Sequence, residues 1–592
     1  MQKTICELFA GVGGFRLGFD RLESGWETTW FSQWEPGART QWAHDCYVQH
    51  FGDSPDLNNE FHTGEDICTV DKQTIPDHTL LVGGFPCQDY SVAHTLSSSH
   101  GIEGKKGVLW WQIRDTIIAK KPPFCIFENV DRLLRSPAKQ RGRDFGVILA
   151  CLAEEGYSVE WRVVNAAQYG AAQRRRRTFI FAYCNDTVYG NKMMDASAED
   201  IIRNDGFMAR AFPIVEMGKM TQTTLEDDIV NVSNSFEFTF ENAGYMPNCN
   251  IYTAKVIEQE DAPVTLGQIL QKNVDSKFYI TTDKMPKWTY LKGAKKIPRK
   301  SANGHEYTFS EGPIAFPDPW DRPSRTMLTS ESTLNRSTHV VSDPSTGRLR
   351  ILTPIEAERL QGFDDEWTNS GMPDRMRYFC MGNALVVPII TRMGNILDKI
   401  IELETNTQNR VDNMSPAERH MKDVLRCPEK QNNYDATDID SIFHYALGIE
   451  GKTLLTILQE AGLTEEEIAW VRSKESDKGL PGKIVEASYF GYELNSRQEA
   501  DFETVGAELK TTAADYDDAT SRYKSGETVS ITQIDFRGPV ETDFYASHLY
   551  NKLKMLIVIF YHRDKTLASK LLYKVFFASL FSPSEEDLAI IK

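Results

Sequence analysis

The fold class is indicated by the stretch Leu81-Val82-Gly83-Gly84-Phe85-Pro86-Cys87-Gln88-Asp89-Tyr90-Ser91. It is a short apolar run that ends in a loop containing Gly and Pro, which is typical of a buried strand followed by a turn. In open α/β sheets, ligands bind beyond the carboxyl ends of the strands. The pattern therefore predicts that the thiol of Cys87 lies at a ligand-binding edge of a sheet.

Apolar runs alternate with helical patterns from residue 1 to about residue 185, which predicts an α/β domain with a doubly wound parallel sheet. The expected strands cover residues 4–9, 28–34, 80–83, 124–127, 158–164 and 178–182. Two later motifs occupy positions comparable to that of Cys87, namely Phe127-Glu128-Asn129-Val130 and Gln173-Arg174-Arg175-Arg176-Arg177. A thiol, a carboxylate and an arginine at one sheet edge can attack, protonate and orient a single flat heterocycle.

The length of 592 residues predicts two or three domains. The pattern weakens into polar loops and short strands after residue 185, becomes regular again after residue 321, and breaks at a polar stretch that follows residue 401. The expected organisation is a first domain at 1–185, an inserted module at 186–321, a return to the first domain at 322–401, a linker at 402–430 and a second domain at 431–592 that is clipped at its end.

Charge and cysteine content narrow the class of protein. The net charge is −18, yet the chain contains basic islands at 105–106, 132–143, 174–177 and 292–300, and those that flank the motif loops suit phosphate contact. The ten cysteines form no Cys-x-x-Cys pair, which disfavours a zinc site or a disulfide scaffold. We find no apolar run of about 18 residues and no signal peptide, so we expect a reduced, cytoplasmic protein without a membrane partner.

A glycine-rich loop follows the first expected strand. In Phe9-Ala10-Gly11-Val12-Gly13-Gly14, the glycines allow the backbone to pass close to a ligand. Glu35 ends the second strand, where an acid can bind ribose hydroxyls, and Asp66-Ile67 suits an adenine amino group and ring. No Lys-Ser/Thr pair follows the glycines, which excludes a P-loop. The ligand inferred is an adenosine compound, and S-adenosylmethionine fits.

The ordered motifs resemble those of the DNA cytosine-5 methyltransferases. The resemblance covers residues 1 to about 400 and rests on Phe9-Ala10-Gly11-x-Gly13-Gly14, Pro86-Cys87-Gln88, Glu128-Asn129-Val130, Gln173-Arg174-Arg175-Arg176-Arg177 and Gly382-Asn383-Ala384. More narrowly, this part is similar to the bacterial methyltransferases that accompany GATC-cutting restriction enzymes. The resemblance implies double-stranded DNA as substrate and a Rossmann-like fold in which residues 186–321 recognise the target sequence from the major groove.

The chemistry of cytosine agrees with these residue types. Carbon 5 is a poor nucleophile, and addition of the Cys87 thiolate to carbon 6 makes the ring electron-rich. Glu128 would hydrogen-bond N3 and the amino group, and Arg175 and Arg177 would steady O2 and the backbone. Because the reacting face is hidden in duplex DNA, the base must flip out.

The family resemblance also implies which residues contact the cofactor. Besides those in the glycine loop and at Glu35, Asp66 and Ile67, they are Pro86, Leu109, Asn383 and Ala384. Many relatives have Ser at the position of Ala384, so only a backbone contact is expected there. The segment around residues 382–386 would pack against the glycine loop and close the cofactor pocket.

The second domain has a motif that suits a metal-dependent nuclease. The motif consists of Asp501, Glu508 and Lys510. Because side chains alternate along a strand, Glu508 and Lys510 are expected on the same face. Carboxylates bind Mg²⁺, so we expect Asp501 and Glu508 as metal ligands and Lys510 as the group that polarises water. With Glu486 upstream and Lys552 downstream, residues 440–592 resemble the MutH/Sau3AI-type endonucleases that cut at GATC.

These features together predict a bacterial restriction-modification protein that joins a DNA cytosine-5 methyltransferase to an endonuclease. An RNA cytosine methyltransferase is the alternative among enzymes, and the large module at 186–321 disfavours it. A non-catalytic DNA-binding protein is a second alternative, disfavoured by the intact set of Cys87, Glu128 and Arg175. For the last domain, DNA binding without cleavage stays open, as does the oligomeric state.

Overall fold

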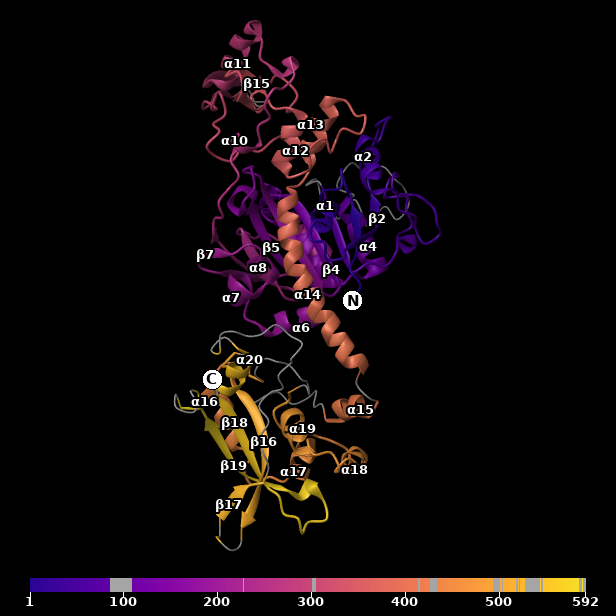
Figure 1. Ribbon diagram of the computed structural model, residues 1–592, viewed down its shortest axis with the longest axis vertical. Coiled ribbons are helices and arrows are strands. Elements are labelled where there is room, and N and C mark those ends of the chain that lie inside the picture. Colours follow the sequence, from indigo (N-terminus) through magenta and orange to yellow (C-terminus); the bar gives the residue numbers. More distant parts are fainter. Residues whose placement is uncertain are drawn as a thin grey trace. The chain divides into compact units, whose positions relative to one another are not determined.

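The computed structural model describes residues 1–85, 109–226, 228–300, 305–413, 416–425, 434–492, 501–502, 504–517, 520, 522–526, 544, 547–584 and 588. Pro86 and Cys87 lie outside these ranges. The chain divides into two compact units, Met1–Gln408 and Asn409–Lys592 (Figure 1). No helix among the described residues is both long enough and apolar enough to span a membrane.

A nine-stranded sheet organises the first unit, with strand order β2-β1-β3-β4-β6-β5-β9-β10-β8. Its strands are β1 (Thr4–Leu8), β2 (Glu27–Ser32), β3 (Leu80–Gly84), β4 (Phe124–Val130), β5 (Tyr157–Asn165), β6 (Arg176–Cys184), β8 (Thr221–Thr224), β9 (Ala243–Met246) and β10 (Asn250–Ala254). The strands β2, β1, β3 and β4 are parallel to their neighbours. The α/β doubly wound class is thereby confirmed, but the sheet is not parallel throughout, because β6 lies antiparallel between β4 and β5.

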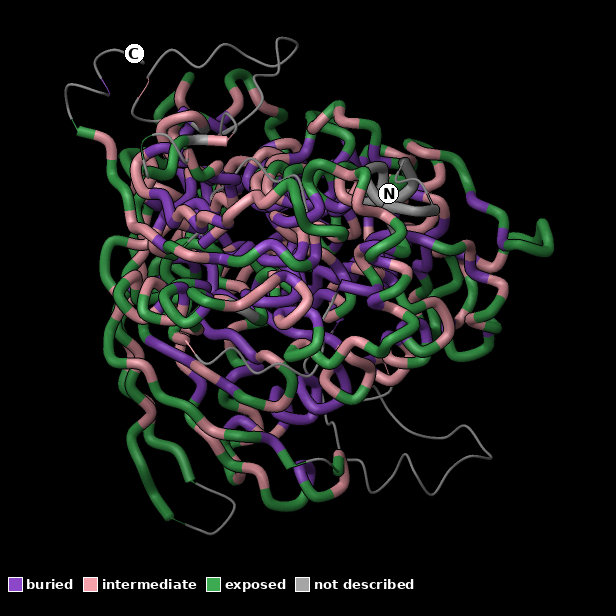
Figure 2. The backbone as a smooth tube through the Cα atoms, turned by 90° about the horizontal axis from the view of Figure 1, so that it is seen from below, coloured by how far each residue is buried: buried purple, intermediate pink, exposed green. Residues whose placement is uncertain are grey.

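Each face of this sheet carries its own apolar core, because successive side chains of a strand point to opposite faces. Leu81 and Phe127 join the core packed under α4 (Leu109–Lys120) and α5 (Arg143–Glu154). Leu80 and Ile126 join the core under α1 (Gly14–Asp20) and α14 (Val387–Asn413). Helices therefore cover both faces, and Figure 2 shows the buried segments gathered in the interior.

The segment expected as an inserted module is partly integral to the main sheet. The strands β8, β9 and β10 extend that sheet, since β9 pairs with β5. Periodicity within such short strands does not reveal their long-range partners, so the sequence did not predict this. Other elements of the segment are α6 (Val188–Asp195), α7 (Ala198–Asp200), α8 (Phe207–Ala211), β7 (Ile214–Met217), α9 (Ile229–Ser235), β11 (Val256–Glu258), α10 (Leu266–Ile269), α11 (Met285–Lys292), β12 (Lys295–Lys300) and β13 (Glu306–Glu311).

The rest of the first unit comprises α2 (Trp42–Phe51), β14 (Val340–Ser342), β15 (Leu349–Ile351), α12 (Pro354–Gln361), α13 (Asp374–Asn383) and α14. A capping box formed by Thr353 and Glu356 starts α12. The helix expected at 386–401 is α14, which continues to Asn413, and α15 (Pro416–Leu425) follows. Much of the expected linker is thus helical, because a polar sequence is compatible with an exposed helix as well as with a loop.

The second unit is built around a four-stranded sheet with strand order β17-β16-β18-β19. Its elements are α16 (Ile439–Leu447), α17 (Leu454–Glu460), α18 (Glu465–Arg472), α19 (Leu480–Lys483), β16 (Glu508–Asp517), β17 (Arg522–Ser525), α20 (His548–Leu553), β18 (Leu556–His562) and β19 (Lys574–Phe581). The central strands β16 and β18 are parallel, and both edge strands are antiparallel to them. This is the expected α/β domain.

Candidate active sites

Glu128 and Arg177 meet at the carboxyl edge of the main sheet. Glu128 lies near the end of β4, and Arg177 lies near the start of β6. Because β6 runs antiparallel to β4, its beginning lies beside the end of β4, and Val130 is in register with Arg177. The Arg177 Nε to Glu128 Oε1 distance is 2.6 Å, and the two side chains keep 18% and 14% of their surface exposed. A carboxylate and a guanidinium are therefore paired at the edge where a ligand is expected.

The strand that leads to Cys87 ends beside this pair. Gly84 is in register with Glu128, and a Cβ at Gly84 would lie 3.3 Å from Glu128 Oε2. The buried Asn129 donates a hydrogen bond from Nδ2 to the carbonyl of Phe85 at 2.8 Å. The backbone immediately before Pro86-Cys87 is thus fixed by β4. The sequence pattern singled out Glu128, whereas this role of Asn129 emerges only from the structure.

Arg175 is located differently from Arg177. It is 2% exposed, and its guanidinium donates to the carbonyls of Met327 at 3.2 Å and Gly382 at 3.0 Å. Burial lowers the pKa of Arg175 to about 9, and the charge of Arg177 adds to this effect while Glu128 opposes it. Of the two arginines expected to steady O2 and the backbone, Arg175 therefore has its terminal nitrogens bound to carbonyl groups of the protein itself.

Gln173 has a similar backbone-binding position. Its Oε1 accepts a hydrogen bond from the Met327 amide at 2.8 Å, and its Nε2 donates to the carbonyl of Leu360 at 3.3 Å. Gln173 is fully buried. Together with Arg175, it connects segments that are distant in the sequence to the edge of the sheet.

The glycine-rich loop connects β1 to α1 and has the geometry that its sequence predicts. Gly11 has φ +57°, open space where a Cβ would stand, and an amide bonded to Gln33 Oε1 at 2.7 Å. Gly13 has φ +86°, and a Cβ there would lie 2.5 Å from the Phe51 ring. Phe9 also adopts positive φ. At Gly14, a Cβ would lie 2.9 Å from Leu385, so the segment after α13 does pack against this loop.

The other expected cofactor residues lie around strand ends and helix ends of the same unit. Glu35 follows β2 and is half-buried, and its burial raises its pKa. Asp66 is half-buried and accepts the Cys68 amide at 3.0 Å, whereas Ile67 is fully buried. The remaining described positions are Leu109 at the start of α4, Asn383 at the end of α13 and Ala384 directly after it. Open space beside Gly11, acidic groups and apolar surface fit an adenosine ligand.

Glu7 is a buried carboxyl group directly before this loop. The Tyr47 hydroxyl donates to its Oε2 at 3.1 Å. Burial raises the pKa of Glu7 to about 8, although Tyr47 and the charge of Arg16 act in the opposite direction. The folded protein therefore favours the neutral acid, and the stabilising contribution, complete below pH ~4.5, is lost as the pH rises through about 8.

Replacement of Glu7 by Gln should remove this pH dependence, because the amide stays neutral. Between pH 5 and pH 8, the variant should gain stability relative to the unaltered protein by at most about 1.4 kcal/mol per pH unit. Urea unfolding of the first unit, measured at several pH values, tests this. The exposed Glu216→Gln variant is the control and should follow the unaltered protein. Parallel pH curves for Glu7→Gln and the unaltered protein would contradict the assignment.

Ser324, His339 and Glu331 have the hydrogen-bond order of a hydrolase triad, which the sequence did not suggest. Ser324 Oγ lies 2.9 Å from His339 Nε2, and His339 Nδ1 lies 3.0 Å from Glu331 Oε1. All three are at most 2% exposed, and Ser324 Oγ is also bonded to the Arg325 carbonyl. A nucleophile must reach its substrate, so we interpret this network as structural.

A second cluster of ionisable side chains lies in the second unit. Glu508 starts β16 and is 1% exposed, and its Oε1 lies 2.7 Å from Lys510 Nζ and 3.2 Å from Lys552 Nζ. Asp501 Oδ2 accepts the Leu509 amide at 2.9 Å. The expected acids and lysines are therefore gathered around the first residues of one strand, although Lys552 comes from α20.

Glu486 completes this cluster from η7 (Ile484–Tyr489), a π-helical turn. Burial, followed by the negative charge of Asp501, raises the pKa of Glu486 to about 7, whereas Lys510 lowers it. Burial and the charge of Glu508 also raise the pKa of Asp501. The carboxyl groups of Glu486 and Asp501 therefore have raised pKa values because each is buried close to another acidic side chain.

Comparison with known proteins gives two family matches, in separate parts of the chain. Residues 3–399 match the family of C-5 cytosine-specific DNA methylases, and residues 490–592 match the family of the DNA mismatch repair enzyme MutH. The type II methyltransferase M.Sau3AI of Staphylococcus aureus is 50% identical over 402 residues, which cover 67% of this chain and 95% of the relative.

Two further relatives are more distant. The type II methyltransferase M.NgoBI of Neisseria gonorrhoeae is 34% identical over 188 residues, covering 31% of this chain and 52% of its own. The type II methyltransferase M.SsoII of Shigella sonnei is 26% identical over 396 residues, covering 67% of this chain and 79% of its own. On the family match and the similarity to M.Sau3AI, this chain belongs to the C-5 cytosine-specific DNA methylases and carries a C-terminal domain of the MutH family.

Proposed function

We propose that this DNA cytosine-5 methyltransferase transfers a methyl group from S-adenosylmethionine to cytosine within GATC, through a covalent adduct of Cys87. The observation that carries the proposal is the Glu128–Arg177 pair at the sheet edge, beside the strand whose end Asn129 fixes directly before Pro86-Cys87. Nucleophile, acid and cation would thus converge on one flipped base.

Each residue would have a distinct role in the reaction. The Cys87 thiolate adds to carbon 6, Glu128 places a proton on N3, and Arg177 donates to O2, which makes carbon 5 nucleophilic. S-adenosylmethionine supplies the methyl group that carbon 5 accepts. Transfer of the carbon 5 proton to water, return of the N3 proton to Glu128 and release of the thiolate then restore the aromatic ring. Arg175 would act indirectly, since it ties Gly382 and Met327 to the sheet edge.

The cofactor would lie over the glycine loop. We assign the site to Phe9, Gly11, Gly13, Gly14, Glu35, Asp66, Ile67, Pro86, Leu109, Asn383 and Ala384. Glu35 would bind the ribose hydroxyls, as acids at this position do in nucleotide-binding α/β folds. The open space beside Gly11 and the packing of Leu385 on Gly14 support this placement.

The C-terminal domain would cut the unmethylated form of the same site. Asp501 and Glu508 would hold Mg²⁺, and Lys510 would polarise the attacking water. Glu486 and Lys552 would add one negative and one positive charge beside these groups. The GATC assignment rests on the motif resemblance of both domains to GATC-specific families. Self-protection supports a shared site, because cleavage at sites that the methyltransferase does not modify would destroy the host's own DNA.

Asn129→Ala is expected to lower the methylation rate by about 10- to 100-fold through misplacement of the Cys87 loop. The reason is that the hydrogen bond to Phe85 is lost while Cys87 and Glu128 are retained. Single-turnover kinetics with a methylatable duplex measure the effect, and Asn129→Asp, which keeps an oxygen but loses the Nδ2 donor, should behave similarly. Unchanged rates in both variants would show that the loop does not depend on this contact.

Bisulfite sequencing of DNA from cells that express the chain tests the proposed activity and site together. The expected result is C5-methylated cytosine at GATC and at no other tetranucleotide, absent from cells expressing Cys87→Ala. Methylation confined to another sequence would refute the GATC assignment. Modified cytosine found only in RNA would favour the alternative of an RNA methyltransferase.

A further inference from the structure

The strands β12 and β13 of the first unit form a hairpin that is rich in basic side chains. Among the residues that the structure describes, β12 and β13 form a separate two-stranded sheet. Their sequences, Lys-Lys-Ile-Pro-Arg-Lys and Glu-Tyr-Thr-Phe-Ser-Glu, contain four basic and two acidic side chains, in a chain whose net charge is −18. A two-stranded hairpin that is not packed against other elements is marginally stable in water. We therefore asked what holds this hairpin in place and what its exposed side chains could bind.

The base of the hairpin is firmly held. The Arg336 guanidinium donates to the carbonyls of Leu291 at 2.9 Å and Gly293 at 3.1 Å, and also to that of Gly312, so it joins both ends. Lys292 is buried, and its ammonium donates to the Arg336 carbonyl at 2.9 Å. The hairpin is therefore positioned by the protein, while its strands stay accessible.

One face of the hairpin packs against its own surroundings. On this face, the Arg299 guanidinium lies 4.0 Å from the centre of the Phe309 ring, and Lys295 Nζ lies 4.8 Å from the centre of the Tyr290 ring. Lys295 also lies 3.7 Å from Glu311. The basic side chains of this face are therefore already engaged by other side chains of the protein.

The residues of the opposite face are exposed, and the register places them in cross-strand pairs. Lys296 is opposite Ser310, Pro298 is opposite Thr308, and Lys300 is opposite Glu306. Lys300 is 3.7 Å from Glu306, whereas Lys296 has no carboxylate partner within the described ranges. An unpaired ammonium therefore stands beside two hydroxyl groups on a narrow two-stranded ribbon.

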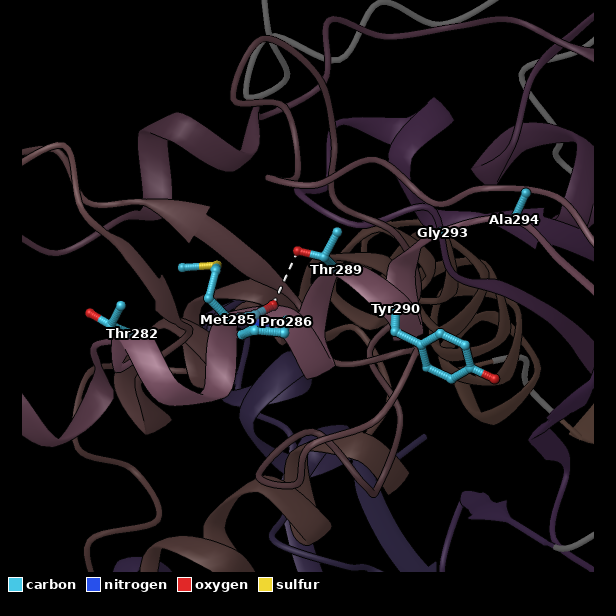
Figure 3. Close-up of a pocket in the computed structure, with 7 residues that line it drawn as sticks. All are labelled: Thr282, Met285, Pro286, Thr289, Tyr290, Gly293 and Ala294. Atoms are coloured by element: carbon cyan, nitrogen blue, oxygen red, sulfur yellow. Dashed lines mark hydrogen bonds between the residues drawn. The ribbon is translucent and has the colours of Figure 1, made fainter.

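The surface next to the hairpin differs in character. A surface pocket of about 760 Å³ on and around α11 is lined by Thr282, Met285, Pro286, Thr289, Tyr290, Gly293 and Ala294 (Figure 3). None of these described lining residues is charged. The pocket lining therefore provides no charged group, whereas the hairpin strands carry four basic side chains.

We propose that the exposed face of the β12–β13 hairpin reads base edges in the major groove, with Lys296 on a guanine and the Ser310 and Thr308 hydroxyls on neighbouring bases. The major groove of duplex DNA admits a two-stranded β-ribbon. Guanine presents O6 and N7 there as acceptors for a lysine, and hydroxyl groups can donate to or accept from any base. This inference rests on the proposed methylation at GATC and assigns the residues that recognise it.

A duplex in which 7-deazaguanine replaces the guanine of GATC tests the lysine contact, because the analogue lacks N7. Lys296→Ala should lower both DNA affinity and kcat/KM on the unmodified duplex by about 5- to 150-fold. The analogue should lower both quantities for the unaltered protein by at least 5-fold, but by less than 2-fold for Lys296→Ala, since that variant has no contact left to lose. Thr308→Val with Ser310→Ala should relax discrimination against duplexes with one altered base pair.

Lys287→Ala is the matched control, because it removes the same charge from an exposed position on α11. It should retain the full response to the analogue, and thermal melting should show that all variants are folded. An equal response of Lys296→Ala and the unaltered protein would overturn the proposal, as would equal effects of Lys287→Ala and Lys296→Ala. Absence of GATC methylation by the unaltered protein would contradict the proposed function, while the binding measurements would still test the hairpin.

Discussion

Replacement of Cys87 by Ala is expected to abolish methyl transfer, with a loss of more than about 10³-fold, while DNA and cofactor binding persist. The reason is that only the thiolate can form the bond to carbon 6 that activates carbon 5. Incorporation of labelled methyl groups into duplex DNA measures the loss, and calorimetry with S-adenosylmethionine measures retained binding.

Cys184→Ala serves as the control for this variant. Cys184 ends β6 at the edge of the sheet opposite to Arg177 and is half-buried, so its loss should change the rate by less than about 2-fold. Near-normal methyl transfer by Cys87→Ala would exclude the covalent mechanism, even if the family assignment stands.

Glu508→Gln is expected to abolish Mg²⁺-dependent DNA cleavage, by at least about 10²-fold, and to leave methylation unchanged. The amide keeps the shape of the side chain but removes the charge that faces both Lys510 and Lys552. The metal would then lose a ligand, and two ammonium groups would lose their carboxylate. Cleavage of an unmethylated GATC plasmid, followed on gels with and without Mg²⁺, measures the effect.

The control for the nuclease site is Asp517→Asn, which removes one negative charge at the far end of the same strand. It should cut at the normal rate. The unaltered protein should leave C5-methylated GATC plasmid intact, and equal cleavage of methylated and unmethylated plasmid would contradict a protective role of methylation. No cleavage of either plasmid would favour a domain that only binds DNA.

The sequence predicted those parts of the first unit that local patterns determine. Apolar runs located β1 to β6 to within a few residues, and Gly11 and Gly13 adopt the positive φ that a tight loop requires. The direction of β6 was beyond prediction, because periodicity does not specify which neighbour a strand pairs with. That direction is what places Arg177 beside Glu128.

At the two sites, the contacts that the sequence did not predict also depend on residues that are distant along the chain. Arg175 belongs to a run of four arginines, which suggests an exposed segment, yet its carbonyl partners come from residues more than 150 positions away. The contact of Asn129 with Phe85 spans 44 positions, as does that of Lys552 with Glu508. Such long-range pairs depend on the tertiary fold, whereas the identities of the reactive groups are visible in short motifs.

The most direct test of the covalent mechanism is a duplex in which 5-fluorocytosine replaces the cytosine of GATC. After methyl transfer, fluorine at carbon 5 cannot leave as a proton does, so the bond between Cys87 and carbon 6 should persist. With S-adenosylmethionine present, we predict a denaturation-resistant protein–DNA complex whose cross-linked peptide contains Cys87 and which Cys87→Ala does not form. Absence of this complex under conditions that methylate the ordinary duplex, or a cross-link at another residue, would contradict the account.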